Sequence, residues 1–390
     1  MKLKSKINSL KDEVIYLRRD FHQYPELGWN EFRTSEKISQ YLNDIGLEVN
    51  IVASTGVMGL LRGKAKGPTL LMRADMDALP IQEMNEVSYK SVNPGVMHAC
   101  GHDGHMAMLM VTAKILSEYK DKIHGNIKFV FQPNEESAEG SKAMIRDGIL
   151  ENPRVDKAMG MHLWSQLGSG LIGIKTGAVM ASLSTFKINI IGKGGHTGYP
   201  EYAIDPIIAA ADMIQQVQLI QTRETSQLNP IIIMFGKIKG GKKNNIIPDC
   251  VEIEGTLRYL NQTGNQEFMN PKERIKELIH LVAQIHRVKV VIDLIEKNKM
   301  VVNCPDMVEI IRTSAKSVVG DKNIVDFVST ASEDFSEFSH YVPSVFYFLG
   351  CGHKEIKNRV SHHNCYFNID EEVLPVGIEI QVHSALNFFK

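Results

Sequence analysis

The sequence predicts an α/β protein with a mixed, mostly parallel sheet flanked by helices and a smaller ferredoxin-like α+β domain inserted into it. Two observations support this fold class. Short apolar runs alternate with helical segments over the first third of the chain, which is the order that forms a largely parallel sheet between helices. From about Ser184 onward, polar and apolar residues alternate, as they do in strands with one solvated face.

The elements of the first part follow from hydrophobic periodicity. Helical periodicity covers residues 5–20 and 31–45, and Gly46 is placed to end the second helix. Apolar runs of strand length, bounded by turn residues, occur at Val57–Leu61, Thr69–Arg73 and Ile127–Phe131. Between the last two runs, Asp103–Tyr119 is apolar on one face and predicts a helix.

The second part reads as strand, helix, two strands, helix and strand. We expect these elements at Thr185–Ile191, Asp205–Leu219, Ile231–Ile238, Val251–Leu257, Glu273–Ile285 and Val288–Ile295. This order matches a ferredoxin-like unit. We therefore expect an inserted domain over residues 184–296 and a larger domain over residues 1–183 and 297–390, which ends in a helix over Pro375–Phe388.

The bulk properties exclude several function classes. The net charge is −1 with both signs interspersed, which argues against a nucleic-acid partner or a membrane surface. The N-terminus lacks the apolar region of a signal peptide, and no apolar stretch approaches a membrane span. Five cysteines, an odd and sparse set, predict no disulfide framework, so we expect a cytoplasmic protein.

The strongest chemical signal is the run from His98 to His105. It holds three histidines, Cys100 and Asp103 just before a predicted helix. Thiolate and imidazole are preferred ligands of zinc-like ions, and a helix N-terminus stabilises a thiolate. The alternative is a polar turn in which Asp103 caps the helix and the histidines lie at the surface.

A second signal is the adjacent pair Glu135–Glu136 at the end of the strand Ile127–Phe131. Strand carboxyl ends are where α/β sheets hold their sites. There one carboxylate can bind a metal while its neighbour acts as a general base. The alternative is a solvated acidic loop.

Three further segments are weak signals individually. His162 follows an apolar run over Lys157–Met161, Asp75 and Asp77 follow the strand Thr69–Arg73, and His362–His363 precede the last helix. The histidines could be metal ligands, and the aspartates could orient them. Equally, each could be an ordinary turn or structural residue. Together they place ligand types at one edge of one sheet.

These motifs, taken in order, resemble those of the N-acyl-amino-acid amidohydrolases, a family of di-metal peptidases that includes hippurate hydrolases, indole-acetyl-amino-acid hydrolases and N-acetyl-diaminopimelate deacetylases. The resemblance covers essentially the whole chain. Its segments are Arg18–His22, Pro25–Gly28, Arg73–Pro80, His98–Asp103, Phe131–Glu136, Gly192–His196, Asn245–Asp249, Glu254–Arg258 and Ser332–Phe335.

The resemblance implies a di-zinc exopeptidase-like fold and two divalent metal ions, Zn or Mn first and Ni or Co also compatible. The ligands it implies are Cys100, His102, Glu136, His162 and His363. It implies that Glu135 is the general acid and base and that Asp77 orients a ligand. His196, Asn245 and Arg258 of the inserted domain would bind the substrate, with His196 also stabilising the developing oxyanion.

One departure concerns the last ligand segment. Family members commonly read His-Ser-Pro there, whereas this chain reads His363-Asn364-Cys365. The spacing to Phe367 and to Asp370–Glu371 favours His363 over His362 as the ligand.

The function that the resemblance implies is hydrolysis of the amide bond of small N-acyl amino acids. The alternative is a metallo-carboxypeptidase or dipeptidase that acts on short peptides. The inserted domain would close over the substrate and could pair two chains into a homodimer.

Overall fold

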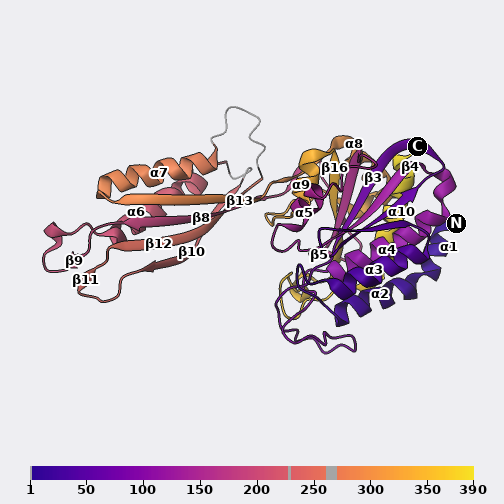
Figure 1. The fold of residues 1–390 in the computed structure, drawn as a ribbon, viewed down its shortest axis with the longest axis horizontal. Helices are drawn as coiled ribbons and strands as arrows, with labels where there is room; N and C mark the ends of the chain where they lie inside the picture. Colours follow the sequence, from indigo (N-terminus) through magenta and orange to yellow (C-terminus); the bar gives the residue numbers. More distant parts are fainter. Residues whose placement is uncertain (1, 227–229, 261–269) are drawn as a thin grey trace. The chain divides into compact units, whose positions relative to one another are not determined.

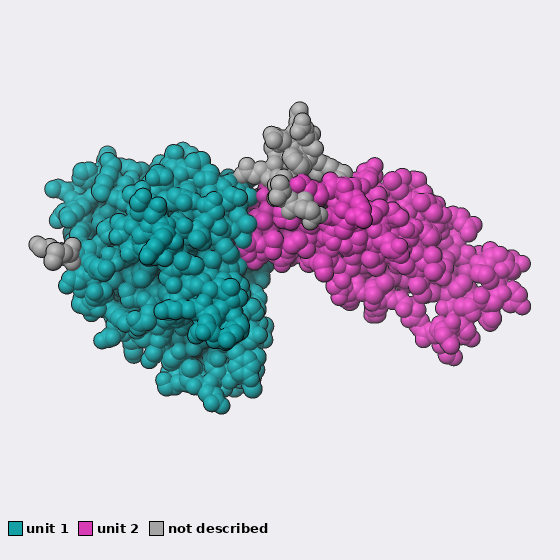
Figure 2. Space-filling view, turned by 180° about the vertical axis from the view of Figure 1, so that it is seen from behind, with its two compact units in different colours: residues 1–179, 301–328, 334–390 teal, residues 180–300, 329–333 magenta. Residues whose placement is uncertain are grey.

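The computed structural model describes residues 2–226, 230–260 and 270–390. The chain divides into two compact units (Figure 2). Unit 1 comprises Met1–Val179, Val301–Val328 and Asp334–Lys390, and unit 2 comprises Met180–Met300 and Ser329–Glu333. The segment Ser329–Glu333 also belongs to unit 2, which no sequence pattern predicts. It joins unit 2 through backbone hydrogen bonds, such as the one that the Ala181 N–H donates to the Ala331 carbonyl at 2.9 Å.

Unit 1 is built on an eight-stranded sheet, counted over the described residues, in the order β1-β2-β4-β3-β5-β16-β6-β15. The central neighbours β4, β3, β5 and β16 pair in parallel, and antiparallel pairs occur toward the sides. This confirms the mostly parallel mixed sheet. The strands are β1 (Glu48–Val52), β2 (Gly56–Arg62), β3 (Ala65–Asp75), β4 (His124–Gln132), β5 (Lys157–Gly168), β6 (Ile172–Gly173), β15 (Ile324–Val325) and β16 (Ser344–Gly352).

The helices of unit 1 pack on this sheet, and β7 (Gly177–Met180) pairs with β14 (Val301–Asn303) outside it. Figure 1 shows α2, α3, α4 and α10 gathered on one side of the sheet. The helices are α1 (Lys2–Ser9), α2 (Lys11–Gln23), α3 (Phe32–Asp44), α4 (His102–Glu118), α5 (Gly140–Arg146), α8 (Pro305–Val319), α9 (Ser336–Tyr341) and α10 (Leu374–Phe388).

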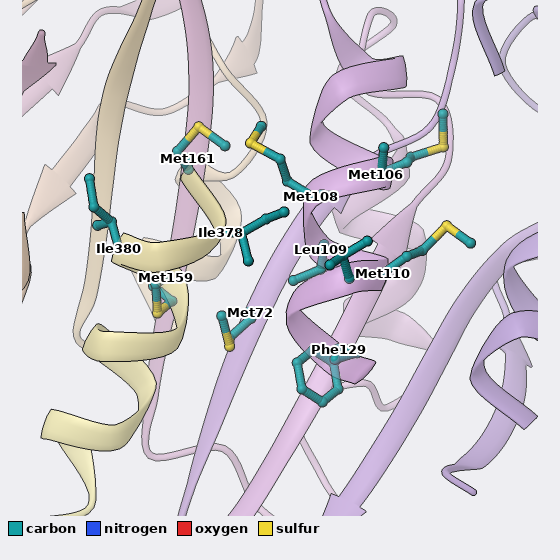
Figure 3. Packing of buried hydrophobic residues seen from close by; sticks show 14 of the residues in the cluster. Met72, Met106, Met108, Leu109, Met110, Phe129, Met159, Met161, Ile378 and Ile380 are labelled. Atoms are coloured by element: carbon teal, nitrogen blue, oxygen red, sulfur yellow. The ribbon is translucent and has the colours of Figure 1, made fainter. Parts of the chain in front are cut away.

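Helix α4 lies at the centre of the core. It contacts α2, α3, α10 and the strands β3, β4 and β5, so nearly all of its residues are buried. Methionines fill much of this packing (Figure 3), among them Met106, Met108 and Met110 of α4 and Met72, Met159 and Met161 of the sheet. An unbranched, polarizable side chain suits the irregular gaps between a helix and a twisted sheet. This core holds the N-terminus of α4 in place.

Unit 2 is a four-stranded antiparallel sheet in the order β10-β12-β8-β13, with α6 and α7 packed on one face. This strand order is that of a ferredoxin-like unit, as the sequence predicts. Asp205 caps α6 and Asn270 caps α7 through their side chains. The elements are β8 (Ser182–Ile191), β9 (Gly195–His196), α6 (Pro206–Leu219), β10 (Ile231–Gly240), β11 (Ile246–Ile247), β12 (Cys250–Tyr259), α7 (Pro271–His286) and β13 (Lys289–Asn298).

Three details differ from the sequence expectations. The helical stretch over residues 5–20 is two helices, with Leu10 between them. Strand β5 continues to Gly168, so His162 lies within a strand and does not follow it. Asp103 lies in the first turn of α4, and the capping position belongs to Gly101. Within the described part of the chain, no helix has the length and apolar character needed to cross a membrane.

Candidate metal centre

The N-terminus of α4 brings two candidate ligands together. Gly101 adopts a left-handed conformation, φ 89°, which turns the chain sharply into the helix. Cys100 therefore lies just before the helix and His102 occupies its first position, and both side chains are buried. The alternative in which these histidines lie at the surface is wrong, because His98, His102 and His105 are at most 1% exposed.

Asp77 orients two further groups of the site. Its main-chain carbonyl accepts the Nδ1–H of His102 at 2.8 Å, and its carboxylate accepts the backbone N–H of Glu136 at 3.0 Å. Donation from Nδ1 leaves the lone pair of His102 on Nε2. This lies 4.0 Å from Glu136 Oε1, as expected of two ligands that face one position.

Three polar atoms of this site make no hydrogen bond within the described structure, although they are buried. They are His102 Nε2, Asp77 Oδ1 and Glu136 Oε1. Buried polar atoms almost always have partners. Burial opposes the charged form of His102, but the carboxylates of Asp75, Asp77 and Glu136 raise its pKa to about 10. The same three carboxylates would also attract a metal cation, which would replace the proton on His102.

Cys100, His102 and Glu136 each offer an atom within 4.8 Å of the other two. His162 adjoins this group, with Nε2 3.6 Å from Cys100 Sγ. Its Nδ1–H donates to the carbonyl of Leu163 at 2.6 Å, and burial lowers its pKa well below the usual range. His162 is therefore neutral, with its lone pair toward Cys100, as metal ligation requires.

His363 completes the set from the C-terminal segment. Its Nε2 lies 3.3 Å from Glu136 Oε1, and its backbone N–H donates to the carbonyl of Ala99 at 2.9 Å. The residue adopts a left-handed conformation, φ 61°, which is sparsely populated by residues other than glycine and is enriched at functional sites. No proline is needed to hold the turn, because Asn364 Oδ1 accepts the backbone N–H of Tyr366 at 2.9 Å.

His362 is directed elsewhere. Its Nε2–H donates to the carbonyl of Leu163 at 3.0 Å, and its Nδ1 lies 3.3 Å from Ser165 Oγ. Both ring nitrogens thus face protein partners, and the geometry favours His363 as the ligand.

Glu135 lies beside this set with a separate environment. It is buried, and its Oε1 accepts the backbone N–H of Asp334 at 3.3 Å. Asp334 is in turn held by Arg73 Nη2 at 3.0 Å and by Gln132 Nε2 at 2.7 Å. The two adjacent glutamates thus have different surroundings, with Glu136 close to Cys100 and His102 and Glu135 in contact with the Asp334 backbone.

A buried ion network behind α4 was not foreseen. Arg18 Nε donates to Asp103 Oδ2 at 2.9 Å, and His22 Nδ1 donates to the same oxygen at 2.7 Å. His22 Nε2 lies 3.1 Å from Glu83 Oε1. Burial opposes ionisation of Asp103, but Arg18 and His22 hold its pKa far below the usual range. Arg18 and His22 thus hold the first turn of α4 next to His102 through Asp103. In the sequence, the only indication of this role was that Arg18–His22 is one of the segments that resemble the family.

Glu31 is a second residue that sequence reasoning missed. Its carboxylate accepts the backbone N–H of Asn134 at 2.9 Å and the hydroxyl of Thr55 at 2.6 Å. Asn134 adopts a left-handed conformation, φ 51°, and packs against Gly28, where a Cβ would lie 2.0 Å from Asn134 Oδ1. These contacts fix the backbone that leads into Glu135.

Unit 2 carries the three expected substrate-binding residues. His196 and Asn245 lie near each other, because β9 pairs with β11 and the carbonyl of Asn245 accepts the Thr197 hydroxyl at 3.3 Å. Arg258 lies at the opposite end of the sheet, paired with Leu183 at the start of β8, and donates to the Thr330 carbonyl at 3.3 Å. Unit 2 therefore groups His196 with Asn245 but not with Arg258.

The model of Peptidase family M20/M25/M40 matches residues 71–387. The chain belongs to this family. This confirms the resemblance that the sequence motifs indicated.

The chain is similar to two curated relatives and one solved structure of this kind. The chain is 36% identical over 390 residues to IAA-amino acid hydrolase ILR1-like 4 of Arabidopsis thaliana, covering 98% of this chain and 87% of that protein. It is 42% identical over 275 residues to N-acyl-L-amino acid amidohydrolase of Geobacillus stearothermophilus, covering 70% of this chain and 74% of that protein. A dinuclear metal-binding M20 peptidase from Bacillus subtilis superimposes with a TM-score of 0.86 at 30% identity, covering 98% of this chain and 99% of that one.

Proposed function

We propose that the protein hydrolyses the amide bond of N-acyl amino acids and releases a carboxylic acid and a free amino acid. One observation carries the proposal. A donor set of Cys100, His102 and Glu136 lies next in the chain to Glu135, a buried carboxylate that is not a member of that set. The relatives named as IAA-amino acid hydrolase and N-acyl-L-amino acid amidohydrolase support this substrate class.

We infer that two divalent ions bind at this site, held by Cys100, His102, Glu136, His162 and His363. The buried polar atoms that make no hydrogen bond in the described structure fit this assignment, and so does the dinuclear site named for the Bacillus subtilis structure. Thiolate, imidazole and carboxylate donors together suit Zn or Mn, with Ni or Co also compatible. When bound, such ions polarise a carbonyl and lower the pKa of a water from 15.7 to about 7.

Glu135 performs the proton transfer. It accepts a proton from the attacking water as the new C–O bond forms, and it delivers that proton to the departing nitrogen as the C–N bond breaks. A positioned base of this kind contributes about 10²–10⁴-fold to the rate. Asp77 keeps His102 and Glu136 oriented during the reaction.

Of the three residues expected to bind the substrate from the inserted unit, His196 and Asn245 lie together and are proposed to act on one molecule, whereas Arg258 lies at the opposite end of the same sheet and is not part of that group. His196 stabilises the negative oxygen that develops on the acyl carbonyl, an effect worth roughly 3–4 kcal/mol where single donors have been removed in other enzymes. Closure of the inserted unit over the substrate would exclude water. We further propose that the protein is cytoplasmic.

Glu135→Gln is the direct test. Turnover of N-acyl amino acids should fall by about 10²–10⁴-fold, while metal content stays unchanged because Glu135 is not a ligand. Glu139→Gln, 43% exposed in the same loop, is the matched control and should keep activity. Near-normal turnover by the Glu135 variant would refute the assignment.

A substrate panel separates this proposal from the alternative. The metal-free protein is reconstituted with Zn, Mn, Ni or Co in turn and assayed with acetyl, benzoyl and indole-acetyl amino acids and with dipeptides. We expect cleavage of the acyl amino acids. Preferential cleavage of dipeptides would assign the protein as a carboxypeptidase or dipeptidase.

We also propose that the inserted unit pairs two chains into a homodimer. In the described sheet of unit 2, the edge strands are β10 and β13, and an uncovered edge offers unpaired N–H and C=O groups. Sedimentation of the full chain should give twice the mass of one chain, 43.7 kDa. A monomeric mass would contradict the pairing.

A further inference from the structure

The peptide groups of Leu163, the residue after His162, lie where β5 is no longer paired with β3, although it still pairs with β16 on its other side. Pairing between β3 and β5 ends at Arg73 and Gly160, whereas β5 continues to Gly168. A buried backbone N–H or C=O that has no strand partner must be satisfied in another way. Three histidine rings supply the partners.

Each ring makes a defined contact with Leu163. His105 Nε2 accepts the Leu163 N–H at 2.8 Å, and the Leu163 carbonyl accepts from His162 Nδ1 at 2.6 Å and from His362 Nε2 at 3.0 Å. The Nδ1–H of His105 donates to Asp75 Oδ1 at 2.6 Å, and Asp75 Oδ2 accepts from Arg73 Nη1 at 2.6 Å.

These contacts determine the tautomers. An Nδ1–H that donates to a carboxylate leaves the His105 lone pair on Nε2, where it accepts the Leu163 N–H. The lone pair of His162 is likewise on Nε2, toward Cys100 Sγ at 3.6 Å. The hydrogen bond on one nitrogen thus decides what the other nitrogen can bind.

The same contacts exclude His105 as a ligand. Asp75, His102, His105 and His162 form a buried cluster whose atoms lie close enough to hold an ion. However, both nitrogens of His105 are engaged, one by Asp75 and one by the Leu163 N–H.

We propose that His105, oriented by Asp75, is a positioning residue that holds the Leu163 peptide and thereby directs Nε2 of His162 into the metal site. The inference rests on the proposed role of His162 as a ligand. His105 contributes no donor of its own to the metal.

Two substitutions at His105 separate its two hydrogen bonds. In His105→Gln, the amide oxygen reaches the position of Nε2 and can accept the Leu163 N–H. In His105→Asn, the shorter amide can reach Asp75 but leaves the Leu163 N–H without an acceptor. His280→Gln and His280→Asn, on the exposed surface of α7, are the matched controls.

The metal readout uses cobalt. Metal-free full-length variants are titrated with Co²⁺, and the affinity and the visible absorption spectrum are recorded. We expect His105→Asn to weaken Co²⁺ binding by about 10–100-fold, the range for partners that orient ligands, and to change the d–d bands. His105→Gln should restore both toward the values of the unsubstituted protein, and the His280 variants should change neither.

The pattern distinguishes the competing roles. Equal losses in the Gln and Asn variants would identify His105 as a ligand and overturn the proposal. If His105→Asn lowers thermal stability but changes neither the Co²⁺ affinity nor the spectrum, His105 has a structural role only, and the proposal is overturned.

A second measurement does not depend on metal or substrate. In the metal-free protein labelled with ¹⁵N-histidine, the His105 signals, assigned by their loss in His105→Gln, should report the Nδ1–H tautomer. An Nε2–H tautomer would refute the proposal even if amide hydrolysis were established. If the protein does not hydrolyse N-acyl amino acids, the Co²⁺ titration and the tautomer measurement still test the role of His105. That result would count only against the proposed function.

Discussion

The main-chain carbonyl of Asp77 accepts the Nδ1–H of His102 at 2.8 Å. This bond sets the tautomer of a candidate ligand through the backbone, so no change to the Asp77 side chain removes it. The carboxylate of Asp77 is then available for a second task, the backbone N–H of Glu136. One residue thus contacts one candidate ligand through its backbone and another through its side chain.

Asp77→Asn should therefore weaken metal binding without abolishing it. The amide oxygen can still accept the Glu136 N–H, but the negative charge near His102 is lost. We expect a fall in metal affinity of about 10–100-fold, measured by competition with a chelator. Asp321→Asn, at a position 75% exposed, is the control. Unchanged affinity in the Asp77 variant would show that its charge does not support the site.

Cys100→Ala should lower the metal content, because it removes the thiolate donor. Elemental analysis of the purified protein measures this directly. Cys250→Ala, at an exposed position on β12, should keep the full content. Full metal retention in the Cys100 variant would count against Cys100 as a ligand.

Arg18→Met should destabilise the fold strongly. Arg18 and Asp103 are fully buried partners, and removal of one partner leaves an uncompensated charge at a cost of about 3–5 kcal/mol. Arg62 pairs with Glu48 where both side chains are 56% exposed, so Arg62→Met should cost less than about 1 kcal/mol. Urea unfolding of both variants gives the comparison. Equal losses in the free energy of unfolding of the two variants would show that the buried Arg18–Asp103 pair is no more important than the exposed one.

Glu31 should make stability depend on pH. Burial, followed by the charge of Asp77, raises the pKa of Glu31 from 4.5 to about 7, against the hydrogen bonds from Thr55 and Asn134. Below about pH 4.5, the carboxyl is protonated in both states and has no effect. As the pH rises to about 7, only the unfolded state ionises freely, so the folded state loses stability, by about 3 kcal/mol in total.

Glu31→Gln removes this penalty and keeps an oxygen that can accept the Asn134 N–H. The stability of the variant relative to the unsubstituted protein should rise between about pH 4.5 and 7 and then level off. Urea unfolding over this range measures it, with Glu309→Gln on the surface of α8 as the control. If the difference in stability between the variant and the unsubstituted protein does not change with pH, the pKa of Glu31 is not raised in the folded state.

Gly28→Ala should disturb the backbone before Glu135. The added Cβ would lie 2.0 Å from Oδ1 and 3.0 Å from Cβ of Asn134, so the whole Asn134 side chain must move. Overpacking of this kind costs about 1–3 kcal/mol, and turnover should fall with it. Gly236→Ala, where a Cβ meets nothing within 4 Å, should change neither quantity. Normal turnover in the Gly28 variant would show that Asn134 does not position Glu135.

Most elements of the fold could be predicted from local pattern. Strands β2, β3 and β4, helix α4 and all of the βαββαβ unit follow from hydrophobic period, because burial of one face or of a whole strand repeats at fixed spacing. The extension of β5 past His162 could not be predicted in this way. Its continuation depends on pairing with β16, a partner far along the chain.

The candidate site shows the same division. The density of ligand types from His98 to His105, and the pair Glu135–Glu136, mark the chemistry locally. Local density could not separate His105 from the ligands, since its two nitrogens are engaged by Asp75 and Leu163. Nor could it pair Glu31 with Asn134 across 103 positions of sequence.

The sequence by itself determined the elements, the family and the residue types that can bind metal, because these depend on composition and spacing. The tertiary structure decided which of those residues face the ligand position and which hold others in place. Hydrogen-bond direction and tautomer depend on atoms that packing brings together. Asp77, His105 and Arg18 therefore acquire their particular roles only once α4 is packed in the core.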